Sequence, residues 1–225
     1  MYSFTYDKEV IYFNYSPGDH ISANWKRGIF YEDRLLQKIR SFNLGGVYVD
    51  LGGHHGNHSI YFDKFCNSDK VISVEGNPYN FKFLKENTIK NNCKTVLYNE
   101  IVSDTQGIEL TMEYDMINTG SSYVVCDNDI NKSIKGNIQT TNITNTLNNL
   151  LKNEDNITLI KMDIENYEYN ALLGAQDIID KYHPIIVIEL HKVNPYYNEI
   201  LEFFDKNNYK TDNINYACSP TFIYM

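Results

Sequence analysis

Short apolar runs alternate with amphipathic stretches along most of the chain. The runs have the length of strands, and the stretches between them place apolar residues at helical spacing. This alternation favours a mostly parallel sheet with right-handed crossovers and helices on both faces. The predicted strands are residues 47–51, 70–75, 95–99, 158–163, 185–190, 209–212 and 221–225, which gives a seven-stranded sheet with a closing pair. The predicted helices are residues 57–66, 78–91, 144–152, 168–181 and 195–207.

Two regions depart from this alternation. Near the N-terminus, residues 2–6 and 9–13 predict a β-hairpin, and residues 31–42 predict a helix. Between residues 107 and 142, short β-like pieces are separated by Gly, Asn and Asp, which predicts an antiparallel β insertion. Its expected strands are residues 108–114, 122–125 and 137–141. We therefore expect an N-terminal extension over residues 1–44 and a single α/β domain over residues 45–225.

Composition and charge narrow the classes of function. The chain has 225 residues and a formal net charge of -9, which repels phosphate and argues against nucleic acid as a partner. The sequence contains no run of about 18 apolar residues that would predict a membrane span. Its first residues lack the pattern of a secretory signal, which indicates a cytoplasmic protein. Cys66, Cys93, Cys126 and Cys218 are scattered, which argues against a zinc knuckle or a disulfide framework.

A glycine-rich segment follows the first predicted strand of the sheet. It reads Asp50-Leu51-Gly52-Gly53-His54-His55-Gly56-Asn57 and leads into a helix. Glycines let the backbone approach a ligand closely, and a helix start supplies free N–H donors. The dinucleotide fingerprint G-x-G-x-x-G would need glycines at His54 and Asn57, so a pyrophosphate site is disfavoured. Taken alone, the pattern also fits a tight strand-to-helix turn.

An acidic residue ends the next predicted strand. Glu75 follows the glycine-rich segment at about the distance, roughly 20 residues, at which a carboxylate can bind the two ribose hydroxyls of a nucleoside. Gly76 and Asn77 come directly after it, and Pro78 stands where a first-turn proline is expected. Together with the glycine-rich segment, Glu75 indicates a nucleoside-containing cofactor.

Further titratable residues cluster at the ends of the last two parallel strands. Asp163 and Glu165 follow one strand, and Glu189 and His191 end the next. Crowded carboxylates raise one another's pKa and can act as a general base or as metal ligands. A plainer alternative is that Glu165 only caps the following helix.

Taken in order, these motifs resemble those of the FkbM-family methyltransferases, a branch of the class I S-adenosylmethionine-dependent enzymes. The resemblance covers roughly residues 30–225, and its most distinctive stretch is residues 160–175. At four positions the chain departs from the usual family residue, with Gly53 for Ala, His54 for Asn, Gly76 for Pro and Asn166 for Gly.

The resemblance implies a Rossmann-like class I methyltransferase fold with S-adenosyl-L-methionine as cofactor. Gly52 and Gly56 would pack against its methionine part, Glu75 would hold the ribose, and Asp104 would lie near the adenine amine. The residues expected to bind the cofactor are Asp50, Gly52, Gly53, His54, Gly56, Asn57, Glu75, Gly76, Asn77, Ser103, Asp104 and Asp163.

The resemblance also implies O-methylation of a sugar, glycan or small natural product. We expect Asp163 to act as the base or to position the acceptor, with Glu165 and His191 as further catalytic residues. The set Asp163, Glu165, Glu189 and His191 could also hold a divalent metal ion. Three alternatives stay open: a noncatalytic nucleoside-binding module, a nucleic-acid methyltransferase and an NAD-dependent oxidoreductase. The sequence does not fix the oligomeric state, and a homodimer is compatible with it.

Overall fold

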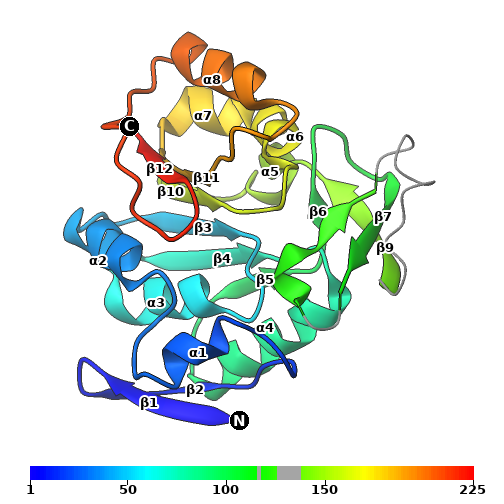
Figure 1. Cartoon of the computed structure of the whole chain (residues 1–225). Coiled ribbons are helices and arrows are strands. Elements are labelled where there is room, and N and C mark those ends of the chain that lie inside the picture. The colour runs from blue at the N-terminus through cyan, green and yellow to red at the C-terminus, as the bar shows by residue number, and fades with distance from the viewer. Residues whose placement is uncertain (116–117, 126–137) are drawn as a thin grey trace.

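A mixed sheet of six strands lies at the centre of the part of the chain that the structure describes (Figure 1). The computed structural model describes residues 1–115, 118–125 and 138–225. Five of the strands run parallel, and the sixth, β12, pairs antiparallel with β11 at one edge. The order across the sheet is β12 (Thr221–Tyr224), β11 (Ile185–Glu189), β10 (Ile157–Met162), β3 (Val47–Leu51), β4 (Lys70–Val74) and β5 (Val96–Tyr98).

Helices cover both faces of this sheet, as the alternation of elements predicts (Figure 1). The layer above the sheet in Figure 1 consists of α5 (Leu147–Leu150), α6 (Glu168–Leu173), α7 (Gln176–Tyr182) and α8 (Tyr197–Lys206). The other layer consists of α2 (Asp33–Ser41), α3 (Asn57–Phe65) and α4 (Pro78–Lys90). None of the described helices is both long and apolar enough to cross a membrane.

Alternating side chains of the strands supply a hydrophobic cluster on each face. In β3, Val47, Val49 and Leu51 belong to the cluster that contains residues of α6, α7 and α8. Tyr48 belongs to the opposite cluster, together with residues of α2 and α3. Successive side chains of a strand point to opposite faces, so a strand covered on both sides is buried along its whole length. All five residues of β3 are buried. The packing on both faces therefore fixes the position of the strand and of its carboxyl end.

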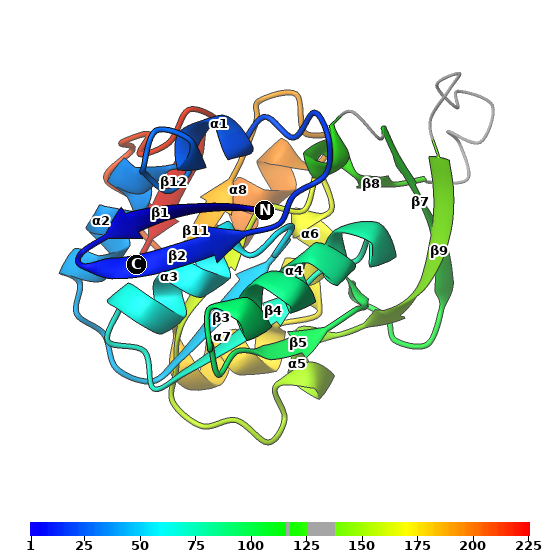
Figure 2. The same ribbon diagram turned by 90° about the horizontal axis from the view of Figure 1, so that it is seen from below.

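The N-terminal extension packs on the face of the sheet that α2 and α3 cover, and it shares the hydrophobic cluster of that face (Figure 2). It contains the expected hairpin, β1 (Tyr2–Tyr6) and β2 (Glu9–Phe13), and a short helix, α1 (Ser22–Trp25), which the sequence pattern did not predict. Phe13 stacks on Trp25 with 3.9 Å between ring centroids and 2° between ring planes. Both side chains are fully buried, so the extension contributes large aromatic groups to the core of the domain.

Two asparagines, one in the last turns of α4 and one that caps its C-terminus, hold the outer edge of the hairpin. The amide of Asn91 accepts from the backbone N–H of Tyr12 (2.9 Å) and donates to the carbonyl of Tyr12 (2.7 Å). The amide of Asn87 makes the same two bonds to Asn14, at 2.6 and 2.8 Å. These side chains satisfy backbone groups that a further β-strand would otherwise pair.

The expected antiparallel insertion is confirmed where the structure describes it. Strand β7 pairs antiparallel with both β8 and β9, and β6 pairs parallel with β9, beside the main sheet. The elements are β6 (Ile101–Val102), β7 (Glu109–Tyr114), the 3-10 turn η1 (Thr119–Ser121), β8 (Tyr123–Val124) and β9 (Ile138–Asn145). Residue 137, which begins the last predicted strand of the insertion, and Cys126 lie outside the described residues.

The expected seventh strand of the main sheet is reduced to a single bridge. Among the described residues, Thr211 bridges Tyr224, and Lys210 exchanges two backbone hydrogen bonds with Met225. The carboxylate of Asp212 then accepts from the backbone N–H of Ile214, which turns the chain away from the sheet.

Two predicted helices are shorter than the sequence pattern indicates. Strand β9 continues to Asn145, and Thr146 caps α5, so the helix predicted over residues 144–152 is a single turn. The helix predicted over residues 168–181 is divided into α6 and α7 at Gly174. A Cβ at Gly174 would lie 2.0 Å from the carbonyl oxygen of Ser103, so the chain is packed there too closely for any other residue.

Candidate functional site

A cavity of about 300 Å³ opens at the carboxyl ends of β3, β4, β10 and β11. This is the edge at which open α/β sheets bind ligands, and the volume is at the lower end for small-molecule sites. Its walls also include residues of the extension, the insertion and the loop before β12. The lining residues are His20, Ile21, Tyr31, Leu51, Gly52, His54, Val74, Glu75, Gly76, Asn80, Glu100, Ile101, Val102, Met112, Asn118, Gly120, Ser121, Ser122, Val124, Asp163, Ile164, Glu165, Tyr167, Glu189 and Ser219.

Gly52 brings the loop after β3 against the end of β10. Its φ of +80° is left-handed, and a Cβ there would lie 1.9 Å from the carbonyl oxygen of Asp163. Its backbone N–H donates to the carbonyl of Val74 (3.0 Å), so the loop closes over the ends of three neighbouring strands. Gly56 has a φ of +91°, and a Cβ there would touch Leu84 and Ile60, so this glycine serves core packing.

Lys161 links the strand end of β3 to that of β10. Its ammonium lies 3.4 Å from Oδ1 of Asp50 and 3.5 Å from Oδ2 of Asp163. Burial alone would lower the pKa of Lys161, but the two carboxylates raise it, so the ammonium stays charged. Asp50 also accepts a hydrogen bond from Ser59 of α3. Asp50 is therefore fully buried beneath the loop, and it does not line the cavity.

Glu75 presents a buried carboxylate to the cavity. The side chain is 5% exposed, and its two oxygens accept from the backbone N–H groups of His54 (2.7 Å) and Asn77 (2.8 Å). Burial raises the pKa of Glu75 to about 7, although the two backbone donors oppose this shift. Each carboxylate oxygen keeps a lone pair after accepting one hydrogen bond, so Glu75 can still accept from ligand hydroxyls.

Three carboxylates that follow or end β10 and β11, those of Asp163, Glu165 and Glu189, also line the cavity. Glu189 hydrogen-bonds Asp163, and burial together with this bond raises the pKa of Glu189 to about 9. Burial alone would raise the pKa of Asp163 as well, but Lys161 and Glu189 hold it below its usual value. The two carboxyl groups therefore hold one proton between them at neutral pH.

Glu165 completes this group of carboxylates. Burial and the charges of Asp163 and Glu168 raise the pKa of Glu165 to about 7. Its backbone is left-handed, with a φ of 54°, and Asn166 follows with a φ of 70°. The side chain of Glu168, not that of Glu165, accepts from the backbone N–H of Ile164 (3.1 Å) at the start of α6. A non-glycine residue held in this conformation inside a cavity is typical of functional sites.

Several residues expected at the site lie outside the cavity lining. Asn57 accepts from the indole N–H of Trp25 and holds Tyr31, and Asn77 caps α4. Ser103 donates to Asp104, which is exposed. His191 is 48% exposed at its side chain and lies 2.9 Å from Glu189, outside the cavity lining. Gly52, His54, Glu75, Gly76, Asp163, Glu165 and Glu189 do line the cavity; Asp50, Gly53, Gly56, Asn57, Asn77, Ser103, Asp104 and His191 do not.

The residues predicted to hold a metal ion do not come together as one ligand group in the described part of the chain. Asp163 and Glu189 pair with each other, while His191 contacts only the far side of Glu189 among these residues. The described group whose ligand atoms do lie close together is Asp19, His54 and His55.

The sequence reasoning missed several residues of the cavity lining. Asn80 and Asn118 each have a buried side-chain oxygen without a hydrogen-bond partner. Asn80 stands within residues 74–87 and Asn118 within residues 118–121, two further segments that resemble motifs of the FkbM family, which was a usable signal. Tyr31, Glu100 and Ser219 also line the cavity, and no pattern in the sequence singled them out.

Comparisons with known proteins show the family and the fold of the chain. The family model described as "Methyltransferase FkbM domain" matches residues 50–211. No curated protein sequence matches the chain. The fold is similar to that of methyltransferase FkbM from Methylobacillus flagellatus KT, with a TM-score of 0.57 and 15% identity, over 80% of this chain and 44% of that one. Precorrin-6y C5,15-methyltransferase from Geobacter metallireducens GS-15 gives a TM-score of 0.49 and 12% identity, over 86% and 85% of the two chains.

The described chain thus spans less than half of the first of these structures, and at 15% identity that likeness concerns the fold. The family model is broader evidence, because it spans most of the chain and includes the glycine loop, Glu75 and the carboxylates that end β10 and β11. The chain belongs to the FkbM family of S-adenosylmethionine-dependent methyltransferases.

Proposed function

We propose that the chain methylates a hydroxyl group of a sugar, glycan or small natural product. One observation carries the proposal: Glu75 and the carboxylate group of Asp163, Glu165 and Glu189 line the same cavity at the carboxyl ends of the strands. Glu75 is suited to bind the ribose of a nucleoside, and the group of three carboxylates is suited to take a proton from an acceptor hydroxyl. A net charge of -9 argues against nucleic acid as the acceptor.

The residues present fit S-adenosylmethionine. Glu75 would accept from the ribose hydroxyls, because backbone donors fix its carboxylate and leave acceptor capacity free. Gly52 allows the loop to lie against the strand ends without a side chain, and Gly76 follows Glu75 along the cavity wall. When bound, S-adenosylmethionine would supply a methyl group on a positively charged sulfur.

The carboxylates would prepare the acceptor hydroxyl. Glu165, whose pKa is raised to about 7, can take a proton at neutral pH. Asp163 is the weaker base of the two, because Lys161 stabilises its ionised form. We therefore assign proton removal to Glu165 and orientation of the acceptor to Asp163. Alignment of the two reactants would supply most of the remaining rate enhancement.

Two asparagines of the cavity lining fit an acceptor with several hydroxyl groups. The buried side-chain oxygens of Asn80 and Asn118 lack hydrogen-bond partners. Their amide nitrogens already donate within the insertion: that of Asn80 to the carbonyl of Thr119, and that of Asn118 to the hydroxyl of Ser121. These oxygens can accept hydrogen bonds but cannot donate them, which favours hydroxyl-bearing ligands over acceptor-only ligands. A sugar or polyol presents such donors at short spacing.

The first test is calorimetric binding of S-adenosylhomocysteine and NAD, followed by transfer of a labelled methyl group to a panel of glycans and small polyols. We expect S-adenosylhomocysteine to bind, and Glu75→Ala to weaken that binding by about 1–3 kcal/mol. Glu199→Gln, which changes an exposed carboxylate on α8, is the matched control and should bind normally. Binding of NAD alone would refute the cofactor assignment.

Transfer to the panel tests the acceptor class. We expect an ether-linked methyl group on a sugar or polyol, identified by mass spectrometry and resistant to base hydrolysis. Methylation at nitrogen or carbon would overturn the hydroxyl assignment. Tight cofactor binding without turnover on any acceptor would favour a noncatalytic binding module.

A further inference from the structure

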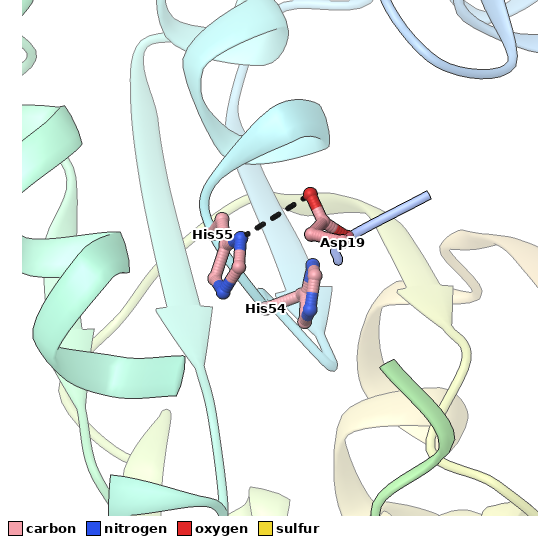
Figure 3. Close-up of side chains that lie close together, drawn as sticks. All are labelled: Asp19, His54 and His55. Atoms are coloured by element: carbon pink, nitrogen blue, oxygen red, sulfur yellow. Dashed lines mark ion pairs between the residues drawn. The ribbon is translucent and has the colours of Figure 1, made fainter. Parts of the chain in front are cut away.

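Asp19, His54 and His55 form a compact group of metal-ligating side chains beside the cavity (Figure 3). One ligand atom from each residue lies within 4.8 Å of the others. Asp19 comes from the loop before α1, whereas the two histidines belong to the glycine loop after β3. The group therefore joins two segments that lie more than thirty residues apart in the sequence.

The polar atoms of this group are buried without hydrogen-bond partners, although His55 and Asp19 lie within ion-pair distance of each other. Asp19 is 5% exposed and His55 is fully buried. Oδ2 of Asp19, Nδ1 of His54 and both ring nitrogens of His55 make no hydrogen bond. Nδ1 of His55 lies 3.6 Å from Oδ2 of Asp19, beyond the range of a hydrogen bond. Buried polar groups in folded proteins are nearly always satisfied. This cluster therefore indicates a binding site for a ligand that imidazole nitrogens and a carboxylate oxygen can hold.

The arrangement of His54 suits metal ligation. Its Nε2 lies 3.2 Å from the hydroxyl of Thr119, and a proton on Nε2 would leave the lone pair of Nδ1 free. An outer hydrogen-bond partner of this kind is usual for histidines that bind metals.

We propose that Asp19, His54 and His55 bind a divalent transition metal ion, with Zn²⁺ the best fit. Two imidazoles and one carboxylate form the donor set of many three-ligand zinc and non-haem iron sites, whereas Mg²⁺ and Ca²⁺ prefer oxygen ligands alone. Bonds of about 2.0–2.2 Å would draw the donor atoms together, and the stacked rings of His54 and His55, with 18° between their planes, would have to turn so that both lone pairs meet at the ion. The inference concerns metal binding itself and stands apart from the proposed reaction.

The site would hold the glycine loop in place. The backbone N–H of His54 donates to Glu75 (2.7 Å), so an ion bound to the side chain of His54 would fix a donor that orients the ribose-binding carboxylate. The same ion would tie the N-terminal extension to that loop through Asp19. Its role is therefore one of positioning.

Metal content and thermal unfolding of the full chain, purified without a histidine tag, test the site. We expect about one equivalent of Zn²⁺ to remain after dialysis, and the unfolding temperature to rise with added Zn²⁺ but not with Mg²⁺. Asp19→Asn keeps the shape of the side chain and should weaken Zn²⁺ binding by more than about 100-fold. Co²⁺ in place of Zn²⁺ should give the visible absorption of a low-coordinate site, and Asp19→Asn should abolish it.

Two further variants keep the test decisive if Asp19→Asn is poorly folded. His55→Phe should fold, because the ring stacks on His54 and packs against Phe83, but it should lose the thermal response to Zn²⁺. His183→Asn removes an exposed histidine elsewhere, at a left-handed position that Asn tolerates, and should bind Zn²⁺ normally. Zn²⁺ binding that is absent in the wild-type chain, or unchanged in both Asp19→Asn and His55→Phe, would overturn the proposal.

Discussion

The ammonium of Lys161 lies 3.5 Å from the carboxylate of Asp163, and both groups are held at the end of β10. Lys161 is 3% exposed at its side chain and also faces Asp50, so it neutralises charge on two strands at once. The ionised state of Asp163 thus depends on a residue that itself lies outside the cavity lining.

Replacing Lys161 by Met should destabilise the fold strongly. The substitution leaves the fully buried Asp50 and the partly exposed Asp163 without their cation, and removing one partner of a buried ion pair typically costs about 3–5 kcal/mol of unfolding free energy. Chemical denaturation at pH 7 measures this loss. Lys181→Met is the matched control, because Lys181 pairs with Asp155 in solvent, and it should unfold like the wild-type chain. Equal stability of the two variants would contradict the assignment.

Gly52→Ala should cost more stability than Gly28→Ala. The two glycines have nearly the same φ, +80° and +79°, but a Cβ at Gly52 meets the carbonyl oxygen of Asp163, whereas nothing lies within 4 Å of a Cβ at Gly28. The Gly28 variant therefore reports the left-handed conformation alone, about 1–2 kcal/mol. Any additional loss of unfolding free energy in Gly52→Ala measures the close approach of this residue to the carbonyl oxygen of Asp163. Denaturation curves give both values, and calorimetry should show that only Gly52→Ala loses S-adenosylhomocysteine binding.

Glu75 should make stability fall as the pH rises. Its pKa is about 7 in the folded chain and 4.5 in the unfolded chain, so the folded state binds the extra proton. This contribution is complete below pH 4.5 and is lost as the pH passes through about 7. Glu75→Gln removes the dependence, so its stability relative to wild type should rise by roughly 3 kcal/mol between pH 4.5 and pH 8. Denaturation at several pH values measures the difference, and a constant difference would contradict the burial of an ionisable Glu75.

Glu165 should set the pH dependence of methyl transfer. With a pKa of about 7, it becomes an effective base only when ionised, so kcat should rise with pH and level off above that value. Glu165→Gln should lower kcat by about 100-fold or more and remove the rise. Asp163→Asn removes a negative charge that raises the pKa of Glu165, so any remaining activity should level off at a lower pH. Single-turnover kinetics measure these profiles, and an unchanged profile in Glu165→Gln would exclude Glu165 as the base.

The periodicity of the sequence predicted most of the sheet, because strands buried on both faces read as uninterrupted apolar runs. The strand ends then placed Glu75, Asp163, Glu165 and Glu189 at one edge, and all four line the cavity. The seventh strand was not predictable in the same way, since Asp212 turns the chain by a side-chain contact that hydrophobic spacing does not report.

The expected position of His191 shows where strand periodicity ceases to apply. Residues two apart share a face only while the chain remains a strand, and β11 ends at Glu189. His191 therefore lies outside, although it still contacts Glu189. Asp50 illustrates another limit, because its partner Lys161 comes from a strand more than a hundred residues later, a contact that local patterns do not encode.

The two asparagines that bond the outer edge of the hairpin fix its register relative to α4. Residues four apart on a helix rise about 6 Å along its axis, and residues two apart on a strand are about 6.6 Å apart, so Asn87 and Asn91 match Asn14 and Tyr12 in spacing. Slippage of the hairpin by one residue would break all four bonds at once. The same amides occupy backbone groups at an edge that would otherwise be open to a strand from another molecule, which is one of the ways in which proteins guard such edges.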